Sequence, residues 1–197
     1  MTRAATDVLI DRIPVGRNLA TDAMWVVAFG LVTAASAQIT IHLPNLPVPI
    51  TGQTFAVLLS GAVLGWRRGL LSQVAYLGAG AAGLPVFADG AGSAMHLVGP
   101  SGGFLLCFPL AAALVGFLVE QGLAQSSWKL VGALLSADVL ILLAGSTWLR
   151  LLFRVSFAQS WQLGFYPFLL ADILKIALVG YPLPRVLRRS EESRQSF

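Results

Sequence analysis

Hydrophobic residues occur along this chain in long stretches with few charged residues, and the short polar segments between them carry most of the charges. Six apolar stretches are separated in this way, at residues 24–41, 54–64, 70–84, 104–121, 130–149 and 165–183. A helix of about 20 apolar residues crosses a hydrocarbon core ~30 Å thick. The pattern therefore predicts an all-α membrane protein, built as a bundle of six transmembrane helices. Because the 54–64 stretch is short, we expect part of the preceding loop to lengthen it.

Two of the connections do not read as ordinary solvated loops. Residues 42–53 contain Pro44, Pro47 and Pro49, which exclude a regular helix, yet the segment is apolar. We expect it to fold back over the outer mouth of the bundle. Residues 86–103 form a Gly-rich connection without Lys or Arg. The remaining expected connections include a tight basic turn at 66–69 and a polar segment at 150–162.

The composition supports a membrane protein. Hydrophobic residues make up 56% of the chain and charged residues 11%, whereas a soluble domain has about 25% charged residues. The net charge of +4 would suit nucleic-acid binding in a soluble protein. Here the Lys and Arg residues lie between apolar stretches, so they indicate topology, and no nucleic-acid partner is expected.

The distribution of basic residues predicts the orientation. With six spans, ten of the thirteen Lys and Arg residues fall on one side, and only Arg150 and Arg154 fall on the other. The positive-inside rule then places both termini in the cytoplasm. We expect a cytoplasmic tail at 1–22 without a cleavable signal peptide, a six-span domain at 23–184, and a basic cytoplasmic tail at 185–197.

Asp172 and Lys175 stand inside the last apolar stretch. Three positions apart on a helix, they project from nearly the same face. Both fall near the middle of the bilayer, where a charge costs about 2.5–3.5 kcal/mol on insertion scales. Such residues usually face a cavity or mark a substrate path, although the two could also form a purely structural ion pair.

Asp138 also falls near mid-depth, in the fifth stretch. It could pair with Lys175 and leave Asp172 free, or act with Asp172 in a proton-coupled carrier. The two halves of the chain show no inverted repeat of broken helices, which would be the usual pointer to a secondary transporter.

Enzymatic chemistry has one candidate, Ser101 in the Gly-Pro-Ser-Gly segment that ends at Gly102. The segment matches the Gly-x-Ser-Gly nucleophile of rhomboid-type proteases, whose base is a histidine on a later helix. Both histidines, His42 and His96, precede Ser101. A Ser101–Lys175 dyad is an alternative, since a buried Lys can lose its proton. A tight turn is nevertheless the favoured interpretation, and we expect no enzyme. Two distant histidines and the single Cys107 offer no metal-ligand spacing.

A binding site for a small polar molecule uses these residues best. Asp172 can accept hydrogen bonds from N–H groups, and Lys175 can donate to a carbonyl or carboxylate. Aromatic side chains can enclose an apolar ring, and loop residues can add polar contacts. The further candidates are Tyr76, Phe87, Gln53, Thr51, Asp89 and His96. Separately, Gly30 and Ala34 form a small-xxx-small pair that would let another helix approach closely.

At these residues the sequence closely resembles the BioY family, the substrate-binding (S) components of energy-coupling factor (ECF) biotin transporters. The resemblance runs in order over about residues 28–179. Its motifs are Ala37-Gln38, Leu46-Pro-Val-Pro-Ile-Thr-Gly-Gln-Thr54, Tyr76-Leu-Gly, Gly83-Leu-Pro-Val-Phe-Ala88, Gly99-Pro-Ser-Gly-Gly103 and Pro167-Phe-Leu-Leu-Ala-Asp-Ile-Leu-Lys175.

The resemblance implies a six-helix S component in a bacterial cytoplasmic (inner) membrane that binds biotin from outside, in a pocket under the loops after the first and third helices. Asp172 and Lys175 would hold the ureido ring, and Asp89 would add a polar contact. Gly30 and Ala34 would meet a membrane coupling (T) subunit, with ATPase subunits as further partners. Biotin is then the transported ligand, and no cofactor is expected. The sequence leaves open whether those subunits are required and whether the chain forms a homo-oligomer.

Overall fold

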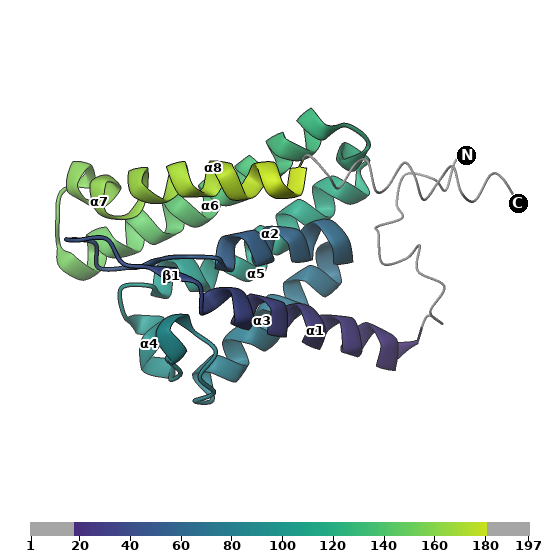
Figure 1. Cartoon of the computed structure of the whole chain (residues 1–197), viewed down its shortest axis with the longest axis horizontal. Coiled ribbons are helices and arrows are strands. Elements are labelled where there is room, and N and C mark those ends of the chain that lie inside the picture. The colour runs from purple at the N-terminus through teal and green to yellow at the C-terminus, as the bar shows by residue number, and fades with distance from the viewer. Residues whose placement is uncertain (1–17, 181–197) are drawn as a thin grey trace, which may run out of the picture.

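The computed structural model describes residues 18–180, with the side chains of the last two left out, and this part of the chain is predominantly α-helical. The longer helices run roughly along the long axis of the molecule (Figure 1). They are α1 (Leu19–Ala37), α2 (Gln53–Leu64), α3 (Trp66–Ala81), α5 (Gly102–Glu120), α6 (Ser127–Phe153) and α8 (Tyr166–Gly180). The shorter elements are β1 (Thr40–Ile41), β2 (Ile50–Thr51), η3 (Ala88–Gly90), α4 (Ala94–Val98), η4 (Leu123–Gln125) and α7 (Phe157–Gly164).

A helix lies at each of the six predicted apolar stretches, so the expectation of a helical membrane protein is confirmed. Among the described residues, four helical segments are long and apolar enough to cross a bilayer. They are α1, α5, α6 and the segment Phe157–Leu178, which consists of α7 and most of α8. Helices α2 and α3 have 12 and 16 residues. At ~1.5 Å per residue they reach about 18 and 24 Å, less than the hydrocarbon core.

The predicted turn at residues 66–69 is wrong, because α3 already begins at Trp66. The reversal between α2 and α3 takes place at the single residue Gly65, whose φ of 80° is readily adopted only by glycine. The first turn of α3 also reaches α1, since Arg68 forms a 2.8 Å ion pair with Asp22. Residues 66–69 therefore form the first turn of α3, and Arg68 links this turn to α1.

The polar connection expected at residues 150–162 is also wrong. Helix α6 continues to Phe153, and α7 starts after only a short break. Ser156 caps α7 through a reciprocal capping box with Gln159. That Ser-x-x-Gln signature was present in the sequence, so the start of α7 could have been found there.

Close approach of α2 and α5 depends on glycine. A Cβ atom at Gly61 would lie 2.3 Å from the carbonyl oxygen of Ala112, so a side chain there cannot fit without a backbone shift. Gly116, one turn further along α5, lies equally close to the Gly65 turn. Small residues at such contacts allow membrane helices to gain van der Waals packing.

A buried polar cluster joins α1, α2 and α3. The Gln73 amide lies 3.2 Å from the Thr33 hydroxyl and 3.1 Å from the Ser60 hydroxyl, as their hydrogen-bond donor. Each of those hydroxyls donates in turn to a carbonyl of its own helix. Interhelical hydrogen bonds of this kind hold membrane helices in one register.

Gly30, half of the small-residue pair predicted to meet a coupling subunit, packs inside the molecule. It is buried, and a Cβ atom there would lie 3.3 Å from the Ser72 carbonyl oxygen of α3. The helix partner of Gly30 on this face is α3, and contact of Gly30 with a coupling subunit stays a prediction. Ala34 is half-buried against the core, and a partner contact there stays a prediction.

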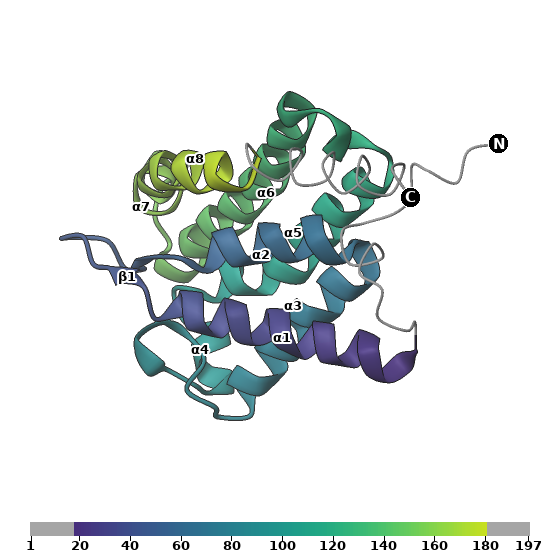
Figure 2. The same ribbon diagram turned by 45° about the vertical axis from the view of Figure 1, so that its right-hand side comes forward.

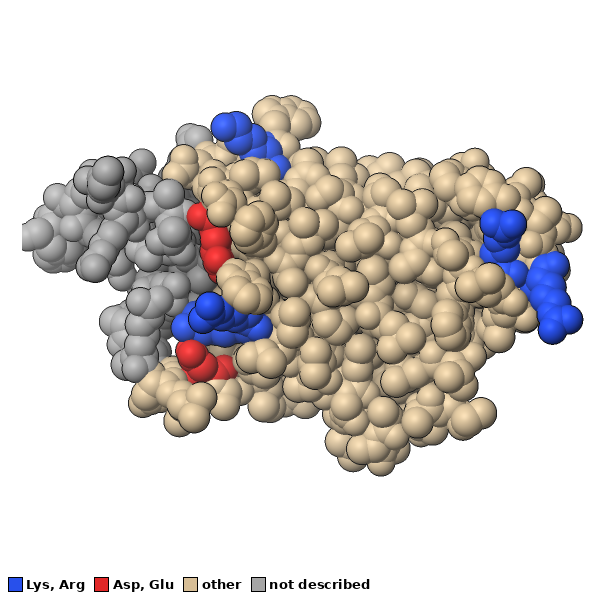
Figure 3. Space-filling view, turned by 180° about the vertical axis from the view of Figure 1, so that it is seen from behind, with Lys and Arg blue, Asp and Glu red and all other residues tan. Residues whose placement is uncertain are grey.

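Charged side chains collect at the two ends of the face shown in Figure 3, and the band between them is uncharged. At the end where α3 begins lie Arg67, Arg68 and Lys129, and the opposite end carries Arg150 and Arg154. Seven of the ten basic residues expected in the cytoplasm lie outside the described residues, as do most of the two predicted tails. An uncharged band between charged ends is the surface expected of a membrane-spanning bundle.

Gly61→Ala should destabilise the protein, because the added methyl group meets the α5 backbone; overpacking of this kind costs about 1–3 kcal/mol. Gly132→Ala in α6 is the matched control, since nothing lies within 4 Å of its Cβ position. The control should unfold at the parental temperature or slightly above it, because alanine favours helix. Thermal unfolding in detergent measures both variants. Equal melting temperatures for the two would show that α2 and α5 are not packed this closely.

Candidate binding pocket

The two unusual connections meet at one end of the bundle. The segment after α1 forms a small hairpin in which Thr40 pairs with Thr51 and Ile41 with Ile50. Figures 1 and 2 both place this hairpin near α4 and α7, away from the start of α1. The two connections therefore lie together at this end of the bundle.

The hairpin side of this end is fastened to the Gly-rich connection by Gln38 and Asp89. Gln38 donates to the Phe87 carbonyl oxygen and accepts from the Gly90 N–H, both at 3.1 Å. Asp89 accepts from Thr40 and faces His42, each at 3.0 Å. Asp89 has a left-handed φ of 58°, which these contacts help to stabilise. Its carboxylate therefore lies against the hairpin.

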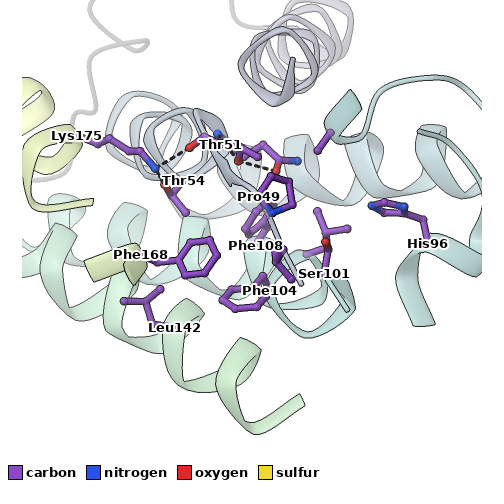
Figure 4. Close-up of a pocket in the computed structure, with 14 residues that line it drawn as sticks. Pro49, Thr51, Thr54, His96, Ser101, Phe104, Phe108, Leu142, Phe168 and Lys175 are labelled. Atoms are coloured by element: carbon purple, nitrogen blue, oxygen red, sulfur yellow. Dashed lines mark hydrogen bonds between the residues drawn. The ribbon is translucent and has the colours of Figure 1, made fainter. Parts of the chain in front are cut away.

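Beneath these connections lies a cavity of about 40 Å³. Figure 4 shows aromatic and aliphatic side chains between two polar groups, Lys175 with Thr51 and Thr54 on one side and His96 with Ser101 on the other. The full lining is Val48, Pro49, Thr51, Gln53, Thr54, Ala88, His96, Ser101, Phe104, Leu105, Phe108, Leu142, Phe168 and Lys175. An apolar wall with a few convergent polar groups is typical of a small-molecule site.

The polar side of the cavity is built around Lys175. Its ammonium donates to Asp172 Oδ1 at 2.6 Å, to the Thr51 carbonyl oxygen at 2.6 Å and to Thr54 Oγ1 at 2.9 Å. Thr54 in turn donates to Asp172 Oδ1 at 2.7 Å. The Lys175 side chain is 17% exposed and that of Asp172 is 1% exposed. Lys175 thus reaches the cavity, while Asp172 lies behind it and neutralises its charge.

Asp138 does not pair with Lys175, so that expectation is wrong. Within residues 18–180 the ion pair of Lys175 is with Asp172. Asp138 is fully buried on α6, one turn from the lining residue Leu142, and it interacts electrostatically with both Asp172 and Lys175. It belongs to the same cluster, behind the cavity wall.

Of the eight predicted binding residues, the structure places Thr51, Gln53, His96 and Lys175 on the cavity wall. The other four are Asp172, Asp89, Tyr76 and Phe87, which lie behind the wall or beside it. Their direct contact with a ligand stays a prediction.

Tyr76 and Phe87 support the wall from behind. Gln53 donates to the Tyr76 hydroxyl, which donates to the Val86 carbonyl oxygen at 3.1 Å. The ring of Phe87 meets Tyr76 edge-on and stacks on His96, with centroids 5.1 Å apart in the stacked pair. Partial burial lowers the pKa of His96 below its ordinary value, and the nearby Asp89 carboxylate opposes that shift. The imidazole is therefore mostly neutral near neutral pH.

The glycines around Ser101 serve close packing. A Cβ atom at Gly103 would lie 2.2 Å from that of Trp148, whose indole N–H donates to the Gly99 carbonyl oxygen at 2.9 Å. Ser101 stands at the start of α5 and lines the cavity. In the described part of the chain it has no hydrogen bond to His96 or Lys175, so the pairing that activates a serine nucleophile is not formed.

Sequence reasoning missed the apolar wall and the fastening role of Gln38. The wall combines Phe104 and Phe108 of α5 with Leu142 of α6 and Phe168 of α8. The spacing of four between the two α5 residues places them on one face, but many apolar residues in this chain share such spacing. Fold and pocket together are those of a multi-pass membrane protein with a candidate small-molecule pocket at one end of its bundle.

Comparison with known protein sequences identifies the family of this membrane protein. The sequence profile of the BioY family matches residues 5–192, and the chain belongs to that family. It is 38% identical over 152 residues to the probable biotin transporter BioY of Pyrococcus horikoshii, covering 77% of this chain and 87% of that one. It is 37% identical over 140 residues to the biotin transporter BioY of Thermotoga maritima, covering 71% and 81%.

A solved structure has the same fold. It is the crystal structure of the S-component for biotin from an ECF-type ABC transporter, with a TM-score of 0.80. The match covers 88% of this chain and 95% of that chain, at 22% sequence identity.

Gln38→Leu should loosen the Gly-rich connection, because Gly90 N–H and the Phe87 carbonyl oxygen both lose their partner. We expect faster amide hydrogen exchange at residues 87–90, with exchange in α5 and α6 unchanged. Gln121→Leu is the control, since Gln121 is exposed at the end of α5 and its side chain makes no hydrogen bond within residues 18–180. Parental exchange at residues 87–90 in Gln38→Leu would refute the fastening role.

Proposed function

We propose that this protein takes up biotin across the cytoplasmic membrane and binds it in the cavity beneath the hairpin and the Gly-rich connection. The observation that carries this proposal is the Lys175 ammonium, held at an otherwise largely apolar cavity wall by a buried carboxylate. A charge at that depth is costly, and it is usually found where a ligand or ion uses it. Family membership and the names of the relatives support biotin as the ligand.

The chemistry of the cavity suits the ureido group of biotin, which has one carbonyl acceptor and two N–H donors. The Lys175 ammonium has three N–H groups that already have acceptors, so it would donate to the ureido carbonyl oxygen in exchange for Thr54 Oγ1. Asp172 Oδ2, which has no donor in the described structure, would accept from a ureido N–H after a small shift. Thr51, Gln53 and Thr54 add further polar atoms. The Phe104, Phe108 and Phe168 rings form a wall for the fused sulfur ring.

Binding requires the cavity to expand. Small-molecule sites usually have volumes of about 300–1,000 Å³, whereas this one measures about 40 Å³. The β1 side of the hairpin is best placed to move, because its contacts with the Gly-rich connection are two exposed contacts of Asp89, with Thr40 and with His42. Such pairs contribute only about 0–1 kcal/mol each.

The proposed topology has α1, α2, α3, α5, α6 and α8 as six crossings, with both termini in the cytoplasm and the pocket opening outward. The basic residues of the two tails and of the α3 start support this orientation, because Arg150 and Arg154 are the only described Lys or Arg residues at the pocket end besides the partly buried Lys175. The apolar residues exposed along α1, which include Met24, Val27 and Leu31, would face lipid or a membrane coupling subunit. Partner ATPases would supply energy through that subunit, unless the protein works alone.

Asp172→Asn and Lys175→Met should each weaken biotin binding. Each removes one partner of a desolvated charge pair, a loss that costs about 2–5 kcal/mol, or roughly 30-fold to several thousand-fold in Kd. Titration calorimetry on purified protein in detergent measures this. The control is Lys129→Met, which removes a charge in the first turn of α6, away from the cavity lining.

The control should bind biotin with the parental affinity. Parental affinity in Asp172→Asn and Lys175→Met as well would reject this site. Failure of the parent to bind biotin at all, while these variants fold normally, would reject the ligand.

A further inference from the structure

Asp138 is the one buried acid that the proposed binding chemistry does not use. It is 0% exposed, and neither of its carboxylate oxygens has a hydrogen-bond donor in the described structure. The buried Oδ2 atom of Asp172 also lacks a donor. Three buried carboxylate oxygens without donors in one cluster are costly, since an unsatisfied buried polar group costs about 1–3 kcal/mol and more when charged.

The two carboxyl groups lie within hydrogen-bonding reach of each other. Neither can donate to the other while both are ionised, because an ionised carboxylate only accepts hydrogen bonds. A proton on one of them would provide an O–H donor at this point. One proton on either carboxyl group would therefore both supply a hydrogen-bond donor and allow the Asp138 and Asp172 carboxyl groups to lie this close together.

The charged groups around Asp138 also favour a proton at this position. The charged groups that act on it are Asp172 and Lys175 of α8. Helix α6 packs against α2, α5, α7, α8 and η4. The titratable residues on the described parts of these elements are Cys107 and Glu120 on α5, Lys129 and Arg150 on α6, and Tyr166, Asp172 and Lys175 on α8.

None of the others can neutralise Asp138. Glu120 is at the far end of α5, where it accepts from the Trp66 N–H, and Lys129 and Arg150 lie in the first and last turns of α6. Two carboxylates against one ammonium would leave an unpaired negative charge inside the membrane. Two acids that share one site do not both ionise readily.

We infer that Asp138 and Asp172 share one proton, which leaves the buried cluster of Asp138, Asp172 and Lys175 electrically neutral. The proton supplies one O–H donor between Asp172 Oδ2 and one Asp138 oxygen, which satisfies two of the three unpartnered oxygens. Asp172 Oδ1 then remains the acceptor for the Lys175 ammonium and the Thr54 hydroxyl, as the structure shows.

The shared proton links the cluster to ligand binding, and this link rests on the proposed function. If the proton is lost at high pH, a second negative charge appears behind the wall and competes for Lys175. Biotin affinity should therefore fall as pH rises above neutral. Because Asn is neutral and nearly the same shape as a protonated Asp, Asp138→Asn should keep the affinity within about threefold of the parent and remove its pH dependence.

Infrared spectroscopy tests the proton directly, without biotin. The parent at neutral pH should show the carbonyl-stretch band of a protonated carboxylic acid, shifted in D₂O, and raising the pH should remove the band. Asp138→Asn and Asp172→Asn should each lack the band. Asp22→Asn is the control, because Asp22 is half-exposed and pairs with Arg68; it should keep the band.

Absence of the band from the parent, or its persistence in both Asp138→Asn and Asp172→Asn, would overturn the shared proton. The parent spectrum and its pH titration decide the question even if a variant fails to fold. Biotin calorimetry from about pH 6 to about pH 9 then tests the link.

An Asp138→Asn variant that weakens binding as strongly as Asp172→Asn would mean that Asp138 acts as an ionised partner of Lys175, and would overturn the proposal. A parent that shows the band but does not bind biotin would reject the proposed function and leave the shared proton standing.

Discussion

The ion pair between Lys175 and Asp172 is the constraint on which the rest of the site depends. Both residues come from α8, but the hydrogen bonds of the pair reach the Thr51 carbonyl oxygen of β2 and the Thr54 hydroxyl of α2. One buried charge pair therefore fixes the last helix against the end of the hairpin. A buried ion pair contributes little net stability, because desolvation offsets the Coulomb attraction. Its value lies in the position it gives to a cationic group at the wall of a cavity.

The remainder of the fold makes that position possible. Glycines at 61, 65 and 116 let α2, α3 and α5 approach closely, and Gln73 joins α1, α2 and α3 through buried hydroxyls. On this compact support the outer connections are held more weakly, mainly by Gln38 and Asp89. The helices are closely packed, whereas the outer connections are held by exposed hydrogen bonds. This combination allows the cover of a site to open while its wall stays in place.

Only part of the site could be predicted from the sequence. Asp172 and Lys175 were identifiable because two ionisable residues inside an apolar stretch break its pattern, and Gln53, Thr51 and His96 because they are polar residues in apolar connections. Asp89 and Gly30 were assigned ligand and partner contacts, which stay predictions, and the structure adds that Asp89 faces His42 and that Gly30 packs against α3. Neither orientation is encoded in local spacing, because the neighbour that decides it lies more than 40 residues away in the chain.

By itself the sequence determined the helical membrane class, the order of the helices and the presence of buried acids and an amine, because hydropathy, proline and charge act locally along the chain. The tertiary structure decided that α3 starts at Trp66, that Lys175 and not Asp172 reaches the cavity, and that Asp138 lies behind Asp172. These depend on how close the helices pack and how each is rotated. Both properties follow from contacts between residues far apart in the chain, such as Gly61 with Ala112 and Lys175 with Thr51.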